Sequence, residues 1–97
     1  MSAYVIFDVE IFDLARYQEF MAGVKPALEA AGGKYLVRGG ECTQLEGVSQ
    51  GDRRVVIEFP SRQAAEAWYN SPEYQAILPH RKANSEGHIA LMDGFEG

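Results

Sequence analysis

The order of strand-like and helix-like stretches constrains this 97-residue chain more than any other feature of its sequence. β-Branched and aromatic residues predict strands over residues 4–10, 34–38, 53–59 and 88–92. Apolar residues spaced three and four apart predict a helix from the N-cap Asp13 to Gly32, and a second helical stretch from Ser61 to about residue 84 with a break at residues 70–72. The resulting order, βαββαβ, is the ferredoxin-like order, in which helices cover one face of a four-stranded antiparallel sheet. We therefore predict a single α+β domain over residues 1–97.

Proline and glycine residues predict where this pattern is irregular. Pro26, inside the first helical stretch, predicts a kink or a break near Gly23, and Pro79 predicts a disturbance near the end of the last helix. Gly39 and Gly40 predict a bulge or turn after the second strand. A weaker strand over residues 42–45 and a turn over residues 47–52 follow.

The two faces of the predicted sheet differ in polarity, because side chains alternate across a strand. The face toward the helices collects only apolar or aromatic residues: Val5, Phe7, Val9, Tyr35, Val37, Val55, Ile57, Phe59, Ile89 and Leu91. The opposite face has an apolar middle, formed by Ile6, Leu36, Val56, Ala90 and Met92. Charged and ionisable groups lie toward its ends, among them Asp8, Arg38, Glu58 and His88.

An apolar middle on a face that no helix covers is unusual, because a solvated sheet face is normally polar. The simplest cover is a second copy of the same sheet, related by a two-fold axis. We therefore expect a homodimer whose two sheets enclose a space. The alternative is a monomer with a moderately apolar open face.

The charge balance excludes several classes of partner. Fourteen acidic residues and nine basic residues give a net charge of −5, which argues against nucleic acid and against anionic membrane surfaces. The third strand, residues 53–59, also lacks the glycine and the outward-facing rings of RNA-binding domains with the same element order. The single cysteine, Cys42, requires no oxidising compartment. Without a basic start or a long apolar run, we expect no signal peptide and a cytoplasmic protein.

Four motifs resemble a known family. They are GGKYLVRGG at residues 32–40, LEG at 45–47, VIEFPS at 56–61 and AWYNSPEY at 67–74. In this order they are similar to a small bacterial family named domain of unknown function 1330. The resemblance implies a ferredoxin-like fold of the dimeric α/β-barrel kind and brings no established reaction. Its recurrent polar positions correspond to Arg38, Glu58, Tyr69, Tyr74 and Arg81, and the wider superfamily is similar to small monooxygenases, isomerases, haem-processing enzymes and stress-responsive modules.

Four residues of the open face are candidate catalytic residues. Asp8 and Glu58 lie on the same face of neighbouring strands, where two close carboxylates form an acid/base pair. Arg38 is expected to pair with Glu58, either to orient an anionic substrate or as a structural salt bridge. His88 begins the strand beside Asp8, so the two residues suit a base and its orienting carboxylate, although a histidine at a strand end is more often a surface residue.

An aromatic wall with an arginine provides the candidate substrate-binding residues Trp68, Tyr69, Tyr74 and Arg81, which suit a planar or carboxylated ligand. Trp68 is also well explained as part of a thin core. The pair Trp68 and His80 is similar to the haem-degrading branch of the superfamily, but that branch has an asparagine where this chain has Asp8. We expect no cofactor, and no metal because the chain contains neither His-x-His nor Glu-x-x-His.

Three functions remain open from the sequence. The first is a small homodimeric, cofactor-free enzyme that acts on an acidic or aromatic organic molecule in a pocket inside the barrel, in the space that the two sheets enclose. The second is a non-catalytic binding or stress-response module that holds a metabolite in the same cavity. The third is a purely structural dimer in which the charged residues fix the register.

Overall fold

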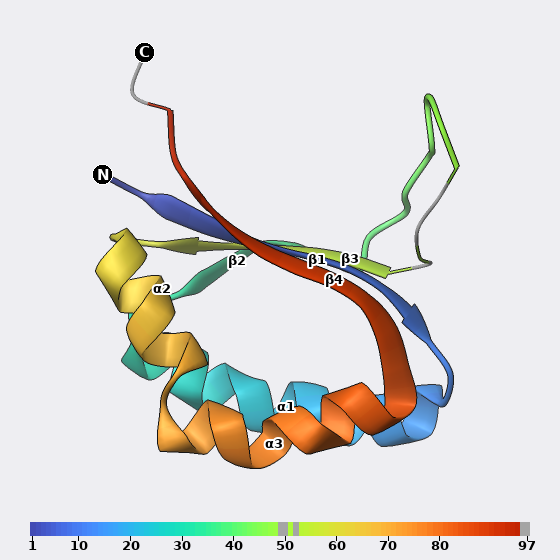
Figure 1. The fold of residues 1–97 in the computed structure, drawn as a ribbon, viewed down its shortest axis with the longest axis horizontal. Helices are drawn as coiled ribbons and strands as arrows, with labels where there is room; N and C mark the ends of the chain where they lie inside the picture. The colour runs from blue at the N-terminus through green and yellow to red at the C-terminus, as the bar shows by residue number, and fades with distance from the viewer. Residues whose placement is uncertain (49–50, 52, 96–97) are drawn as a thin grey trace.

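The computed structural model describes residues 1–48, 51 and 53–95. The elements are β1 (Ala3–Ile11), α1 (Leu14–Ala30), β2 (Lys34–Arg38), β3 (Arg53–Phe59), α2 (Arg62–Tyr69), α3 (Pro72–Asn84) and β4 (Ser85–Asp93). The strands form an antiparallel sheet in the order β2-β3-β1-β4, and all three helices lie on one side of it (Figure 1). The predicted α+β, ferredoxin-like fold is therefore confirmed.

Short polar side chains begin each helix. Asp13 accepts a hydrogen bond from the Arg16 backbone N–H at the start of α1, and the hydroxyl groups of Ser61 and Ser71 cap α2 and α3 in the same way. Gly32, with φ +82°, follows the end of α1 in the left-handed conformation that favours glycine. These caps fix the starts of the helices, and the second helical stretch is divided between α2 and α3 at the predicted break, residues 70–72.

The core lies between the sheet and the helices. The helix-facing side chains of β1 and β3 pack against one buried stripe of α1, formed by Tyr17, Phe20, Val24 and Leu28. Because this stripe buries four large side chains, α1 continues without interruption past Pro26, and the predicted break is wrong. Pro79 is likewise accommodated inside α3, which continues to Asn84.

The segment after β2 differs from the prediction. Residues 42–45 form no strand, and the predicted turn over residues 47–52 lies partly outside the described residues. The described part of this loop extends away from the sheet on the side opposite the helices (Figure 1). Its apolar side chains Leu45 and Val48 are 90% and 84% exposed.

A β-bulge corrects the predicted position of Arg38. Tyr35 pairs with Ile57, but the register shifts after it, so that Val37 pairs with Val56 and Arg38 with Val55. Directly opposed residues of antiparallel strands share a face. Arg38 therefore lies on the helix side of the sheet and Val37 on the open side, the reverse of the strict alternation that the sequence suggested.

Candidate functional site

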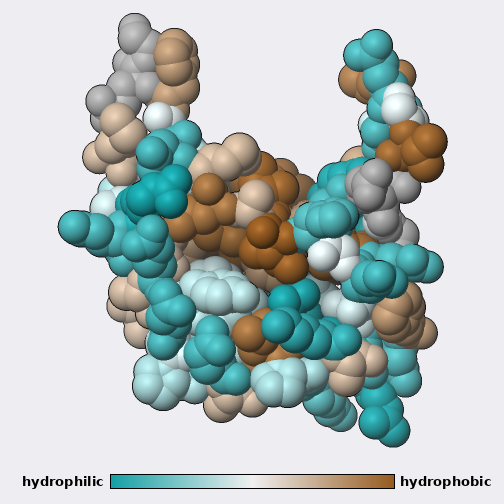
Figure 2. Space-filling model, in the orientation of Figure 1, coloured by the Kyte–Doolittle hydropathy of each residue, from teal (hydrophilic) through white to brown (hydrophobic). Residues whose placement is uncertain are grey.

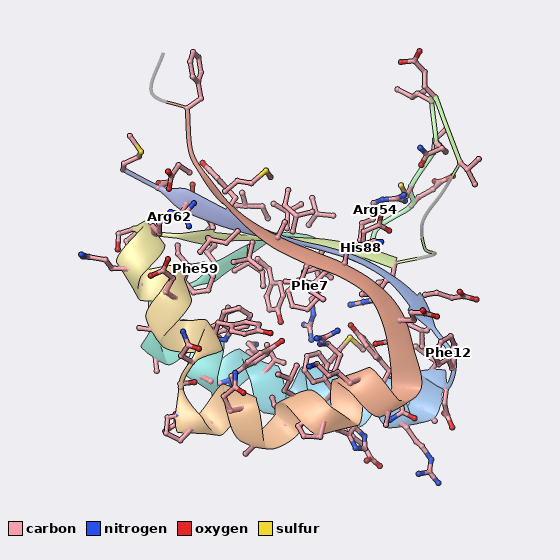
Figure 3. The ribbon with its side chains drawn as sticks, viewed as in Figure 1. Phe7, Phe12, Arg54, Phe59, Arg62 and His88 are labelled. Carbon is pink, nitrogen blue, oxygen red and sulfur yellow. The ribbon has the colours of Figure 1, made fainter. Side chains whose placement is uncertain are left out.

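An arginine of α3 points into the space between the helices and the sheet. The buried positions of α3 are Tyr74, Leu78, Arg81 and Asn84, whose spacing marks its inward stripe. Arg81 is only 5% exposed, and its Cζ lies 6.0 Å from the centre of the Phe7 ring on β1. Figure 3 shows Phe7 on the helix side of the sheet. The Arg81 Nε has no hydrogen-bond partner among the described residues, and no carboxylate of the described chain forms an ion pair with its guanidinium.

The Tyr74 hydroxyl is a second buried polar group without a partner. Tyr74 has no exposed surface, and its oxygen lacks a hydrogen-bond partner among the described residues. Burial raises the pKa of Tyr74 to about 12, although the positive charge of Arg81 acts in the opposite direction. The hydroxyl is therefore protonated at neutral pH and able to donate a hydrogen bond.

Arg53 of β3 lies against another buried tyrosine, Tyr17 of α1. The Arg53 Cζ lies 6.0 Å from the centre of the Tyr17 ring, and its buried Nε has no hydrogen-bond partner within the described ranges. Burial raises the pKa of the Tyr17 hydroxyl, while the charges of Arg53 and Arg81 oppose that rise. A Cβ at Gly39, whose φ is +68°, would overlap the Arg53 guanidinium, so glycine at this position leaves room for the arginine.

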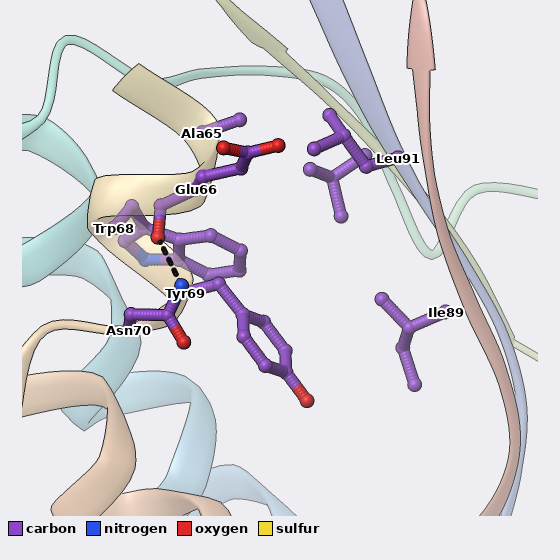
Figure 4. Close-up of a pocket in the computed structure, with 8 residues that line it drawn as sticks. Ala65, Glu66, Trp68, Tyr69, Asn70, Ile89 and Leu91 are labelled. Carbon is purple, nitrogen blue, oxygen red and sulfur yellow. Dashed lines mark hydrogen bonds between the residues drawn. The ribbon is translucent and has the colours of Figure 1, made fainter. Parts of the chain in front are cut away.

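A cavity of about 230 Å³ opens between α2 and the strands β1 and β4 (Figure 4). Its wall consists of the following residues: Val5, Ala65, Glu66, Trp68, Tyr69, Asn70, Ile89 and Leu91. The Tyr69 ring faces the strand that carries Ile89 across this space. Glu66, the one carboxylate in this wall, forms an ion pair with Arg62 at 3.6 Å.

Aromatic rings connect this cavity to the buried polar groups. The ring centre of Tyr74 lies 4.4 Å from that of Trp68 and 5.2 Å from that of Tyr69. Trp68 is 1% exposed and packs on Phe59 at 5.3 Å, which confirms its place in the core. The predicted binding residues Trp68, Tyr69, Tyr74 and Arg81 thus all lie on the helix side of the sheet.

The candidate catalytic residues do not form one group. Asp8 is in register with Arg54 on β3, whereas Glu58 is in register with Tyr4. Asp8 and Glu58 are thus separated by four residues along the strands, about 13 Å, and the predicted carboxylate pair is wrong. The predicted Arg38–Glu58 pair is also absent, because the Arg38 Cζ lies 4.8 Å from the Tyr35 ring centre on the other face. Glu58 instead accepts a hydrogen bond from the Tyr4 hydroxyl at 3.1 Å.

Asp8 and His88 are neighbours on the open face, as expected from the strand order. They are directly opposed in register, and Arg54 is opposed to Asp8 on the other neighbouring strand. The Asp8 carboxylate lies 3.7 Å from the Arg54 guanidinium, and its Oδ1 is buried without a hydrogen-bond partner among the described residues. Arg54 also donates hydrogen bonds to the Cys42 thiol at 2.8 Å and to Gln44 at 3.2 Å. The catalytic role of this pair stays a prediction.

Sequence reasoning overlooked Arg53 and Tyr17. Arg53 stands two residues before Val55, so strand alternation alone already places it on the helix-facing side. Tyr17 belongs to the apolar stripe of α1 and was interpreted as core only.

Within the described residues, no group of three histidine, cysteine, aspartate or glutamate side chains is arranged to hold a metal ion. In the same part of the chain, no helix is long and apolar enough to cross a lipid bilayer.

Comparisons with known proteins identify the fold. Residues 2–95 match the family described as domain of unknown function (DUF1330). No curated protein matches the chain. A solved structure of a protein of unknown function from Rhodopseudomonas palustris has 19% sequence identity and a TM-score of 0.82, and the match covers 99% of this chain and 84% of that chain.

Two further solved structures share the fold. SnoaB, a cofactor-independent oxygenase from Streptomyces nogalater, is 11% identical with a TM-score of 0.65, over 99% of this chain and 95% of that chain. HapK from Hahella chejuensis is 13% identical with a TM-score of 0.61, over 98% of this chain and 94% of that chain. At these identities the likeness shows the fold alone.

Proposed function

Because the chain belongs to the DUF1330 family, whose description names no reaction, we propose its function from the geometry of its interior. The protein is a small homodimer in which each protomer binds a small aromatic or acidic organic molecule between α2 and the sheet. It acts on this molecule with its own side chains, without a resident cofactor. The observation that supports this proposal most is an aromatic-walled cavity beside the buried Arg81 Nε and the buried Tyr74 hydroxyl, neither of which has a hydrogen-bond partner among the described residues.

The size of the cavity suits one aromatic ring with a short substituent. An apolar cavity of about 150 Å³ is enough to bind benzene, and this cavity measures about 230 Å³. Trp68 and Tyr69 supply ring faces on the α2 side, and Ile89 and Leu91 supply branched aliphatic surface on the β4 side. A planar molecule would therefore contact apolar groups on both of its faces.

The chemistry available next to the cavity is stabilisation of negative charge. The Arg81 guanidinium supplies a positive charge with fixed N–H donors, and the Tyr74 hydroxyl, whose pKa burial raises, keeps its proton at neutral pH. Fixed donors of this kind, inside an interior that excludes most water, stabilise an oxyanion more than the same groups do in solution. An enolate or phenolate that forms during a reaction would be favoured there.

A non-catalytic binding module is the second candidate, and one observation favours it. The only carboxylate lining the cavity, Glu66, is ion-paired with Arg62, so the described wall offers no unpaired carboxylate as a general base. Asp8, Glu58 and His88 lie on the open face, on the other side of the sheet.

A test for turnover distinguishes the enzyme from the binding module. A molecule extracted from freshly purified protein and then returned to it would be converted by an enzyme but recovered unchanged from a binding module.

The open face supports the homodimer. Its apolar side chains Leu36, Val37 and Met92 are 47%, 43% and 47% exposed. Figure 2 shows an apolar area between two projecting parts of the chain, the loop after β2 and the C-terminal end. Phe95 in the latter is 97% exposed. A second copy of this face would cover both the patch and the projecting apolar side chains. Because the cavity lies on the opposite side of the sheet, the dimer would contain two binding sites.

The single tryptophan allows a direct test of binding, because Trp68 lines the cavity. Toluene, a neutral single-ring probe, should shift the NMR signal of the Trp68 indole N–H with saturation. Ile89→Phe, which fills part of the cavity, should weaken this binding at least fivefold, and the matched control Ile89→Leu should leave it within twofold. No change of the Trp68 signal in the wild-type protein with toluene or with benzoate would refute the proposed site.

A further inference from the structure

We propose that the buried guanidinium of Arg81, with Arg53 and the Tyr74 hydroxyl, binds the carboxylate of an aromatic monocarboxylate. This inference rests on the proposed function and names its substrate class. It specifies a negatively charged group on the ligand, and it adds Arg53 to the groups that bind the ligand.

The charge of the interior is unbalanced. Arg81 is 5% exposed, and no aspartate or glutamate of the described chain forms an ion pair with Arg81 or Arg53. Burying a cation without an anionic partner is unfavourable, and arginine cannot avoid the cost by losing its proton. The surface arginines Arg16, Arg54 and Arg62 all have carboxylate partners. Arg81, Arg53 and Arg38 on the helix side form no ion pair with a described carboxylate, and Arg81 is the buried one of the three, so it is the cation that most lacks an anion which a ligand would bring.

Two series of contacts connect the Arg81 guanidinium to the cavity wall, one through the side chain of Phe7 and one through the side chain of Tyr74. On the sheet, Ile89 of the cavity wall is directly opposed to Phe7, and the Phe7 ring is the one that Arg81 approaches at 6.0 Å. Opposed residues of antiparallel strands have Cβ atoms about 5 Å apart. On the helices, the wall residue Tyr69 contacts Tyr74, whose hydroxyl feels the charge of Arg81. A carboxylate on the side of the ring nearest to Phe7 and Tyr74 would therefore point toward Arg81.

The space next to Arg53 suits a single small polar group. A cavity of about 20 Å³ lies among Phe7, Tyr17 and Arg53. This is slightly more than the minimum of roughly 10–15 Å³ that a water-sized atom needs. The ring would therefore occupy the larger cavity, and a carboxylate oxygen would extend toward the smaller one. A guanidinium pairs with a carboxylate through two parallel hydrogen bonds, and a protonated tyrosine adds a third donor.

Benzoate and its neutral analogue benzamide test the inference, because they share a shape and differ in charge. Wild-type protein should bind benzoate at least tenfold more tightly than benzamide, as measured by titration of the Trp68 signal. Arg81→Gln should abolish this preference. Arg53→Gln should reduce the preference, and Arg81→Lys should retain part of it. The control Arg16→Gln, on the exposed side of α1, should change neither affinity.

The outcomes separate this inference from the proposed function. If benzamide binds as tightly as benzoate to the wild-type protein, the carboxylate site is refuted and the aromatic cavity stands. If neither molecule binds, the proposed function fails and the inference fails with it. The wild-type comparison decides the question even if Arg81→Gln does not fold. An Arg81→Gln variant that folds and still prefers benzoate tenfold would also overturn the inference.

Discussion

The Arg81 guanidinium of α3 lies 6.0 Å above the ring of Phe7 on β1; its Nε has no hydrogen-bond partner in the described part of the chain, and 95% of the residue is shielded from solvent. A cation over an aromatic face gains some electrostatic stabilisation, about 1–2 kcal/mol when the pair is desolvated. The penalty for desolvating an ion in a protein interior is several kcal/mol. The contact with Phe7 therefore does not by itself compensate for the burial of Arg81.

Replacing Arg81 by an apolar residue of similar length should stabilise the protein. Arg81→Met keeps most of the side-chain volume and removes the buried charge, so we expect the free energy of unfolding to rise by about 1–3 kcal/mol. Urea denaturation at neutral pH measures this change. A loss of more than 2 kcal/mol would show instead that Arg81 holds the fold together.

Stability should decline at high pH because of Tyr74. Its folded-state pKa is about 12, above the ordinary value of 10.0, so the unfolded chain loses the proton first as the pH rises. Tyr74 thus contributes about 2–3 kcal/mol that is present below pH 10 and is lost as the pH rises through 12.

The variant Tyr74→Phe isolates this contribution. It should unfold with a shallower alkaline slope and with little change in stability at neutral pH, because the hydroxyl has no hydrogen-bond partner of good geometry among the described residues. Tyr17 and Tyr35, whose pKa values burial also raises, should maintain the remaining slope. Identical alkaline unfolding of the variant and the wild-type protein would show that Tyr74 does not cause the loss of stability at high pH.

Alanine variants of two adjacent glycines, Gly39 and Gly40, test whether Gly39 leaves room for the Arg53 guanidinium. Gly39 has φ +68°, and a Cβ there would meet the Arg53 guanidinium, whereas a Cβ at Gly40 meets nothing within 4 Å. Gly39→Ala should therefore destabilise the protein by about 1–2 kcal/mol and lower the affinity for benzoate. Gly40→Ala should change neither quantity by much. Thermal unfolding and benzoate titration of both variants measure the effects, and equal behaviour of the pair would refute this role of Gly39.

A charge in the middle of the open face should separate the protomers. Val56 lies opposite Ile6 on this face, so Val56→Glu would place a carboxylate between the two sheets of the proposed dimer. Light scattering should then report a folded monomer. The control Leu14→Glu, which changes a 55% exposed apolar residue on α1, should remain dimeric. A wild-type protein that is monomeric at micromolar concentration would contradict the proposed dimer directly.

The fold followed from sequence because its signals are local. The caps Asp13, Ser61 and Ser71 and the alternation in β1 and β3 each depend on neighbouring residues only. Pro26 shows the limit of such signals, because the buried stripe of α1 outweighs the local preference of a proline.

The candidate site depended on register, which local patterns do not determine. One extra residue in the bulge after Tyr35 moves Arg38 to the other face of the sheet. Asp8 and Glu58 share a face as predicted, but their separation is fixed by the pairing of β1 with β3. Arg81 was predicted as a binding residue, yet its burial and its lack of a partner emerge only when α3 packs against Phe7.

A crystal structure of the protein with benzoate tests the central claim most directly. We predict the benzoate ring between Tyr69 and Ile89, with its carboxylate directed toward Arg81 and Tyr74, in both protomers of a dimer. Benzoate bound only on the open face beside Asp8 and His88, or absent from the interior at saturating concentration, would contradict the account.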